Sequence, residues 1–143
     1  MKAVLLQFAG LALSGCVTSE AEREIPGCTM LECVGLGESQ QVGRYAGDLV
    51  ITPLEVLEDS RCPIEAECVW EGRVRLSARV TMGQETITTE LTSEQPLRIN
   101  GGMLSIGEVA PEASSQRMPL EPDDYRVGFL FAPDQMVVPG PAS

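Results

Sequence analysis

The five cysteines are the residues of this chain whose spacing points most clearly to chemistry. Cys16 stands alone, whereas the other four form two close pairs, Cys28 with Cys33 and Cys62 with Cys68. An odd number of cysteines in an exported protein requires a separate use for one thiol. If Cys16 is acylated, the remaining four can form two disulfides. Three pairings are formally open, and pairing between sequence neighbours is the simplest.

The first 15 residues have the three parts of an export signal: a cation, an apolar stretch and a small-residue exit. Lys2 precedes apolar residues 3–13, which are too few for the roughly 20 residues that span a bilayer, so we expect the segment to be removed. Residues 13–16 (LSGC) resemble the lipobox of bacterial lipoproteins. That resemblance implies cleavage before Cys16 and attachment of a diacylglyceryl group to its thiol. An ordinary secreted protein is the alternative.

The lipobox implies a location and a domain plan. Val17, rather than Asp, follows the cysteine, which in Gram-negative lipoproteins implies sorting to the outer membrane, facing the periplasm. We expect a signal peptide over 1–15, a lipidated N-terminus and flexible tether over 16–34, a folded domain over 35–133 and a C-terminal tail over 134–143. The polar segment that follows Cys16 cannot bury apolar surface, as a tether requires.

The most distinctive stretch of the chain is residues 59–72, DSRCPIEAECVWEG. A bridge between Cys62 and Cys68 would close a seven-residue ring, worth roughly 2 kcal/mol on the loop-entropy account. We expect Trp70 to plug the end of the domain beneath this ring. The simplest interpretation is a stapled connection between strands, because disulfides in exported domains are mostly structural.

A second interpretation of the same stretch is a recognition loop. A disulfide-closed ring loses little entropy on binding, as in protein-binding and protease-inhibitor loops. The side chains expected to be presented for recognition are Arg61, Ile64, Glu65 and Glu67.

The motif D-S-R-C-P over residues 59–63, followed by C-x-W-x-G over 68–72, resembles one found in small bacterial lipoproteins and secreted proteins of uncharacterised function. The resemblance extends more loosely over 35–131. It implies a similar location and fold, and it implies no activity.

Several kinds of catalysis lack their usual residues. The chain has no histidine, which removes the base of Ser/His/Asp and Cys/His mechanisms and the usual nitrogen ligand of zinc. Paired carboxylates remain as an alternative hydrolase site, either Glu65 with Glu67 or Glu71, or Asp123 with Asp124. One tryptophan and two tyrosines offer few sugar platforms, however.

Cofactor signatures are also missing from the sequence. The acidic run at 121–124 (EPDD) lacks the alternating spacing of an EF-hand calcium loop. The glycines cluster at turns and do not form a nucleotide-binding pattern. We therefore expect a non-enzymatic protein with no cofactor and no metal site.

The charge of the chain limits its partners. It contains 10 Lys and Arg against 21 Asp and Glu, and removal of 1–15 takes only Lys2, which leaves a net charge of −12. Such a charge repels nucleic acids and anionic headgroups and favours cationic partners, although its simplest effect is solubility. We expect no nucleic-acid partner, a membrane contact through the lipid anchor, and an envelope protein as partner.

The elements that must position these residues have the pattern of β-strands. Apolar and polar residues alternate over 68–82, as in a strand with one buried face. Gly83 and the Asn100-Gly101 pair mark hairpin turns, and the proline-containing stretch 110–124 marks a loop. Further strands are expected at 39–42, 47–58 (bent at Thr52-Pro53), 85–91, 97–99, 103–109 and 125–131.

No mature segment has the apolar spacing of a helix, so the sequence predicts an all-β fold. The form expected is an antiparallel β-sandwich of about seven strands. An immunoglobulin-like topology stays open, although the cysteines close local loops and do not join two sheets. Together these features predict a membrane-anchored envelope lipoprotein with a non-enzymatic binding or structural domain.

Overall fold

The computed structural model describes residues 27–42 and 49–134. The expected signal peptide, Cys16, the tether before residue 27 and the tail from residue 135 lie outside the described residues. Within the described part, no helix is long and apolar enough to cross a membrane.

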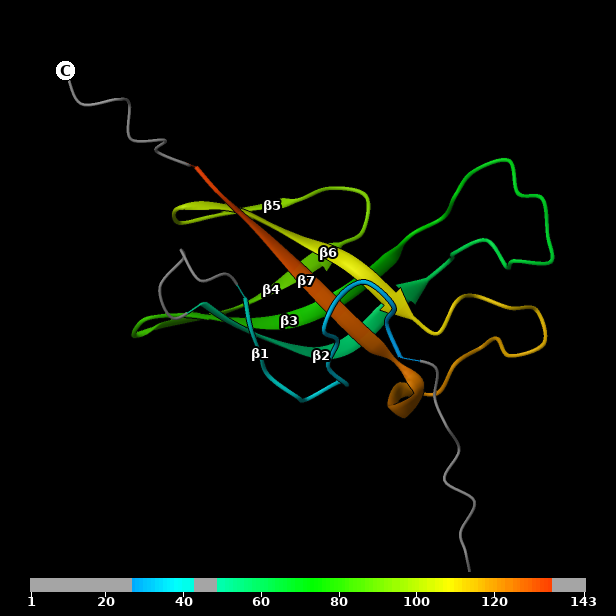
Figure 1. The fold of residues 1–143 in the computed structure, drawn as a ribbon, viewed down its shortest axis with the longest axis horizontal. Coiled ribbons are helices and arrows are strands. Elements are labelled where there is room, and N and C mark those ends of the chain that lie inside the picture. The colour runs from blue at the N-terminus through cyan, green and yellow to red at the C-terminus, as the bar shows by residue number, and fades with distance from the viewer. Residues whose placement is uncertain (1–26, 43–48, 135–143) are drawn as a thin grey trace, which may run out of the picture.

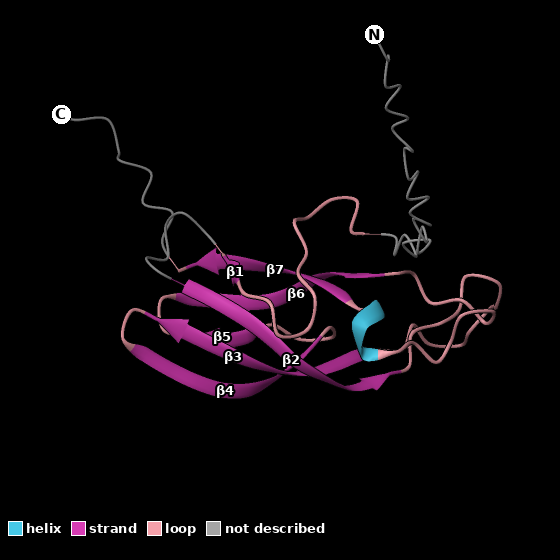
Figure 2. Ribbon diagram, turned by 90° about the horizontal axis from the view of Figure 1, so that it is seen from below, coloured by secondary structure: helices cyan, strands magenta, loops and turns pink. Residues whose placement is uncertain are grey.

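The described chain is all-β, with seven strands in two antiparallel sheets and one short 3-10 helix. One sheet has the order β1-β2-β3-β4 and the other β5-β6-β7, and the two lie one above the other in Figure 2. The elements are β1 (Gln40–Gln41), β2 (Leu49–Asp59), β3 (Val74–Met82), β4 (Glu85–Thr92), β5 (Leu97–Ile99), β6 (Gly102–Ala110), η1 (Pro122–Asp124) and β7 (Arg126–Pro133). The prediction of an all-β fold is confirmed.

The predicted bend in β2 is also confirmed. The register between β2 and β3 shifts at Pro53/Glu55 and again at Val56/Glu58. Pro53 has no N–H to donate to a neighbouring strand, so a central strand can contain it only at an irregularity of this kind. Its carbonyl still accepts the N–H of Gly37, at 2.7 Å.

Both predicted hairpins form, and glycine supplies the unusual backbone conformation in each. Met82 pairs with Glu85 across a turn in which Gly83 has a φ of +60°. In the β5–β6 turn Gly101 alone has a positive φ, of +86°. Glycine adopts such angles without the steric cost that a Cβ imposes.

The strand predicted over 68–82 begins only at Val74, so the prediction is wrong for its first six residues. Gly72 has a φ of +72°, which breaks the extended conformation. A Cβ there would lie 1.7 Å from the carbonyl oxygen of Ser60, so only glycine fits. From Val74 onward the buried positions alternate as expected.

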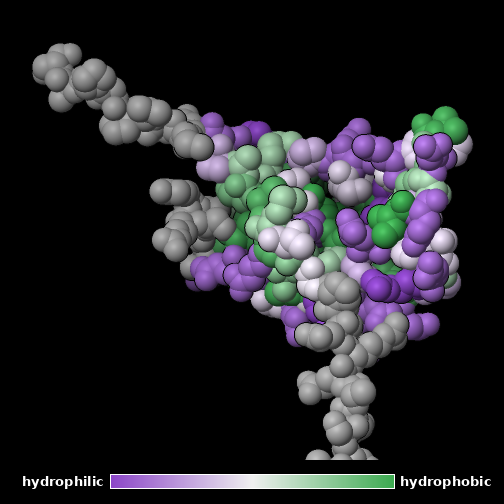
Figure 3. Space-filling model, turned by 45° about the vertical axis from the view of Figure 1, so that its right-hand side comes forward, coloured by the Kyte–Doolittle hydropathy of each residue, from purple (hydrophilic) through white to green (hydrophobic). Residues whose placement is uncertain are grey.

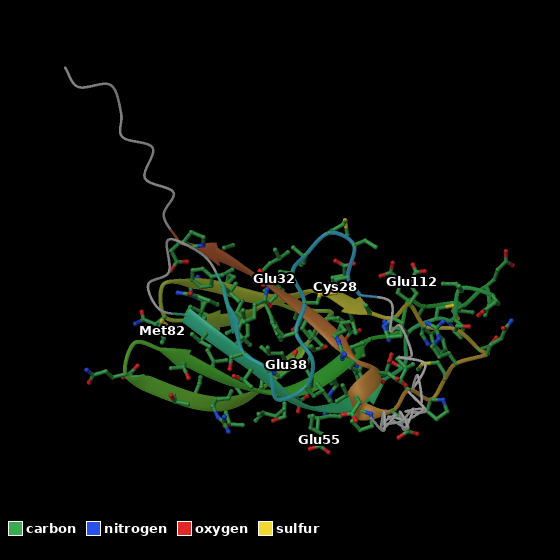
Figure 4. All side chains as sticks on the ribbon, turned by 60° about the horizontal axis from the view of Figure 1, so that its bottom comes forward. Cys28, Glu32, Glu38, Glu55, Met82 and Glu112 are labelled. Atoms are coloured by element: carbon green, nitrogen blue, oxygen red, sulfur yellow. A yellow bond between two sulfur atoms is a disulfide. The ribbon has the colours of Figure 1, made fainter. Side chains whose placement is uncertain are left out.

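The apolar core draws on both sheets. Leu49 and Leu76 from the first sheet and Leu104 and Val127 from the second are fully buried. Figure 4 shows side chains filling the space between the two layers. The other members of the core cluster are Val42, Ile51, Ala78, Val80, Leu91, Ile99 and Phe129.

Residues 27–34, the described end of the expected tether, lie against the second sheet. Val34 forms an isolated bridge with Val127 of β7, with N–H···O distances of 3.0 and 2.9 Å. Gly128 faces Cys33 so closely that an added Cβ would lie 2.7 Å from its sulfur. Hydrogen bonds to β6 and β7 therefore hold these residues against the second sheet.

Candidate functional site

Both disulfides join sequence neighbours, which confirms the simplest of the three pairings. Cys28 is bonded to Cys33 and Cys62 to Cys68, each with a Cα–Cα separation of 5.9 Å. The two bridges close different loops. The first lies against β6 and β7, where Val34 pairs with Val127 and Thr29 N–H donates to Glu108.

The second bridge closes the connection between β2 and β3, residues 60–73, which we call the disulfide loop. The ladder of the two strands continues into it, because Ser60 N–H donates to the carbonyl of Arg73 at 2.8 Å and Cys62 N–H to that of Glu71 at 3.1 Å. The loop extends beyond the sheets at the right of Figure 1.

The base of the disulfide loop is fixed by an ion pair between Arg61 and Asp59. Arg61 donates from Nε and Nη2 to the two carboxylate oxygens, at 2.8 and 2.7 Å. Its Nη1 donates to the carbonyls of Val109 and Pro111, at 2.9 and 3.0 Å, and the hydroxyl of Tyr125 donates to Asp59 at 3.0 Å. We call this group the latch, since it ties the loop to the end of β6 and to Tyr125, the residue before β7.

The latch contradicts one expectation and explains two pKa shifts. The Arg61 side chain is only 18% exposed, so the prediction that the loop presents it for recognition is wrong. Burial alone would raise the pKa of Asp59, but the hydrogen bonds and charge of Arg61, with the Tyr125 hydroxyl, outweigh it and lower that pKa. Burial and the nearby Asp59 charge raise the pKa of Tyr125.

Glu65 fixes the other side of the disulfide loop. Its carboxylate accepts the hydroxyl of Ser114 at 2.5 Å and the N–H of Ser115 at 3.0 Å. Ile64 N–H donates to the carbonyl of Ala113 at 2.9 Å. The hydrogen bonds from Ser114 and Ser115 lower the pKa of Glu65. Glu65 therefore joins two loops and is not held ready for a partner.

Three large apolar side chains of the disulfide loop remain in solvent. Ile64 is 65% exposed, Val69 93% and Trp70 77%; we call these three residues the apolar tip. Figure 3 shows apolar groups standing among hydrophilic ones on the loop-bearing end. Glu67 and Glu71, beside Val69 and Trp70, are also exposed. Of the four predicted recognition residues, the structure thus presents Ile64 and Glu67.

The expectation that Trp70 plugs the domain is wrong, and sequence reasoning missed Val69 altogether. The positive φ of Gly72 separates residues 68–71 from the regular strand, so the alternation there does not determine which side chains are buried. A signal was present in the sequence. Three consecutive nonpolar residues, Cys68, Val69 and Trp70, cannot all lie on one face of a strand.

Trp70 forms one wall of a hollow of about 400 Å³ at the base of the loop, which it shares with charged residues of β2, β3 and β4. Arg73 lies in this hollow, and its guanidinium contacts Glu58 at 3.1 Å and Glu94 at 3.2 Å. Glu71 lines the same hollow, and no interaction of its side chain is found within the described chain.

Two of the carboxylates considered for acid–base catalysis, Glu65 and Asp124, have structural contacts. A general acid working near neutral pH needs a raised pKa, whereas the hydrogen bonds of Glu65 lower its pKa. Asp124 is buried, and its carboxylate accepts the N–H of Glu121 at 3.2 Å, within the 3-10 turn. Glu65 and Asp124 are therefore held by contacts within the domain, whereas the side chains of Glu67 and Glu71 make no hydrogen bond or ion pair in the described chain.

The first disulfide loop, residues 28–33, is held by Glu108 of β6. The carboxylate accepts the N–H groups of Thr29, Met30 and Leu31, at 2.7, 3.0 and 3.0 Å. The hydrogen bond from Thr29 is the main cause that lowers the pKa of Glu108. The sulfurs of Cys28 and Cys33 lie near this carboxylate, but they are bonded to each other and are not metal ligands.

The described chain starts beside the disulfide loop. Gly27 and Ile64 line one hollow of about 360 Å³, together with the end of β6 and the connection that follows it. The start of the described chain and Ile64 thus lie close together, whereas Trp70 lines the other hollow. Comparison of the chain with known protein families, with characterised proteins and with solved structures finds no match.

Proposed function

We propose that this chain is a bacterial envelope lipoprotein whose folded domain is a non-enzymatic protein-binding module. In this proposal residues 1–15 are a signal peptide and Cys16 carries the lipid. The apolar tip of the disulfide loop is the surface that contacts the partner.

The observation that carries the proposal is the exposure of Trp70. It is the only tryptophan of the chain, and 77% of its surface is in solvent. Isolated apolar residues on a surface are ordinary, but this loop exposes three large ones. Tryptophan is also one of the three residue types, with tyrosine and arginine, that are enriched among those that dominate protein–protein binding energy.

The surroundings of the loop support a preformed binding surface. The latch holds the base of the loop, and the Cys62–Cys68 bridge closes its ring. The hydrogen bonds of Glu65 hold its side. A loop restrained at three places has lost most of its freedom before a partner arrives, so less binding energy is spent on ordering it.

The remaining expectations belong to the same proposal. We take the two sheets to be the layers of a sandwich, because both contribute to one apolar core. The motif over 59–72 groups the chain with the small lipoproteins it resembles, and Val17 favours the outer membrane. Several acyl chains on Cys16 would give stable anchoring, which requires at least two.

Lipid anchoring places the tip close to the membrane. Ten residues separate Cys16 from Gly27, a reach of at most about 40 Å over the eleven Cα–Cα steps when fully extended. Gly27 and Ile64 line the same hollow, so the first described residue lies close to one member of the tip. A partner lying within or on the membrane surface would be in reach.

Site-specific photocrosslinking in cells tests the function. A crosslinker at Val69 should join the protein to a defined partner, and the adduct should disappear when Trp70→Ala is added. A crosslinker at Ile87, an apolar residue of β4 that is 52% exposed, is the matched control. The proposal is refuted if both positions give the same adducts, or if Trp70→Ala leaves the Val69 adduct unchanged.

Cys16→Ser tests the anchor independently. The variant should leave the membrane fraction, and intact-mass analysis of the native protein should show acyl chains on its first residue. An unmodified amino terminus, or membrane fractionation that survives the substitution, would disprove the lipoprotein proposal.

A further inference from the structure

We infer that the partner presents a basic side chain, arginine above all, to the exposed face of Trp70. This inference rests on the proposed protein-binding function and names the chemistry that the tip recognises. It follows from the distribution of charge around the indole.

The disulfide loop has acidic groups available and no available cation. Glu67 and Glu71 are exposed on either side of the Val69–Trp70 pair, without an ion pair in the described part of the chain. The two arginines of the loop are already occupied, Arg61 in the latch and Arg73 by Glu58 and Glu94.

The hollow beside Trp70 combines an aromatic wall with negative charge. Three carboxylates line it, those of Glu58, Glu71 and Glu94, against the single guanidinium of Arg73. Glu58 is balanced further by Arg75, at 3.0 Å. Glu71 has no such balance, so an incoming cation finds an acceptor next to the indole.

Arginine satisfies both features at once. Its planar guanidinium stacks on the face of tryptophan, which attracts cations through the ring quadrupole. Its N–H groups remain available at the edge for a carboxylate such as that of Glu71. The chain's excess of acidic residues also draws a basic partner toward it over longer distances.

A lipid surface is the competing occupant, because tryptophan also favours membrane interfaces. Here Glu71 lines the same hollow as Trp70, and immersing Trp70 would carry this carboxylate toward anionic headgroups. The local charge therefore favours a basic protein surface.

The fluorescence of the single tryptophan provides the test. The full-length lipoprotein in detergent is titrated with the peptide acetyl-Gly-Arg-Gly-Arg-Gly-amide and with the same peptide carrying Gln for Arg. The arginine peptide should change Trp70 emission in a saturable way at millimolar concentrations, and the glutamine peptide should not. Added salt should weaken the binding.

Two isosteric variants separate a local charge effect from a general one. Glu71→Gln should weaken arginine-peptide binding about threefold, the worth of one exposed ion pair. Glu85→Gln removes the same charge at the opposite end of the molecule, in the β3–β4 turn, and should change nothing. Equal effects of the two variants, or equal responses to the two peptides, would overturn the inference.

In the last experiment, phosphatidylcholine vesicles are added to the Cys16→Ser variant, which is expected to be soluble without the lipid. A saturable blue shift of Trp70 with vesicles, and none with the arginine peptide, would assign the tip to the membrane and overturn the inference. If a Trp70-dependent crosslink forms in cells but the arginine peptide does not change Trp70 emission, the binding function stands and only the inference about arginine is wrong.

Discussion

Removal of the Arg61 side chain is expected to destabilise the domain by about 3 kcal/mol, at the lower end of the range for breaking a buried ion pair. In Arg61→Ala the carboxylate of Asp59, 5% exposed, loses two charged hydrogen bonds. The carbonyls of Val109 and Pro111 lose their donor as well. The lower end applies because the guanidinium is still 18% exposed.

The chain offers a matched control for this prediction. Arg98 and Asp134 form an ion pair at 2.8 Å, but their side chains are 64% and 40% exposed. Pairs of this kind contribute between about 0 and 1 kcal/mol. Arg98→Ala should therefore change the free energy of unfolding far less than Arg61→Ala, although each substitution removes the arginine partner of an aspartate.

Chemical denaturation followed by far-ultraviolet circular dichroism measures both variants. Trp70 is unsuitable as the probe, since it is exposed in the folded state. If Arg61→Ala costs no more than Arg98→Ala, the latch does not hold the disulfide loop, and the argument for a preformed tip is wrong.

The latch also predicts a pH dependence. Because the pKa of Asp59 is lowered below its ordinary 3.8 in the folded protein, the latch stabilises fully above that value. This stability is lost as the pH falls through the folded pKa. In Arg61→Ala the buried carboxylate has no such partner, so the gap in stability between wild type and variant should narrow on acidification.

Three further predictions concern the loops. Gly72→Ala should destabilise the domain well beyond the roughly 1–2 kcal/mol that a positive φ costs, because its Cβ would meet the Ser60 carbonyl. Gly83 also has a positive φ but has open space around it, so Gly83→Ala should lose only that roughly 1–2 kcal/mol of unfolding free energy in chemical denaturation. Serine at both Cys62 and Cys68 should cost about 2 kcal/mol in the same measurement. Glu108→Gln should lower the protection of the first disulfide loop against hydrogen exchange, measured relative to the unfolded chain at the same pH. In the wild type this protection should persist on mild acidification and fall only as the pH drops through the lowered pKa of Glu108.

Much of the fold could be predicted because apolar and polar residues alternate along a regular strand that has one buried face. The alternation from Val74 to Met82 and the glycines of the two hairpins identified their elements correctly. The bend at Pro53 was also visible, since proline removes a donor from a central strand. In each case a local rule agrees with the tertiary structure.

The candidate site was only partly predictable, because its residues are placed by long-range contacts. The carbonyls that hold Arg61 belong to Val109 and Pro111, about fifty residues away. Glu65 is likewise fixed by Ser114. A charged residue in a loop looks available in sequence, and only the fold shows which partner takes it.

The exposure of Trp70 on a folded, disulfide-closed loop is the claim on which the binding proposal depends, and acrylamide quenching measures it directly. The folded protein should emit near the wavelength of tryptophan in water and be quenched almost as efficiently as the denatured, reduced chain. A blue-shifted emission that acrylamide reaches only after denaturation would place Trp70 inside the domain and contradict the account.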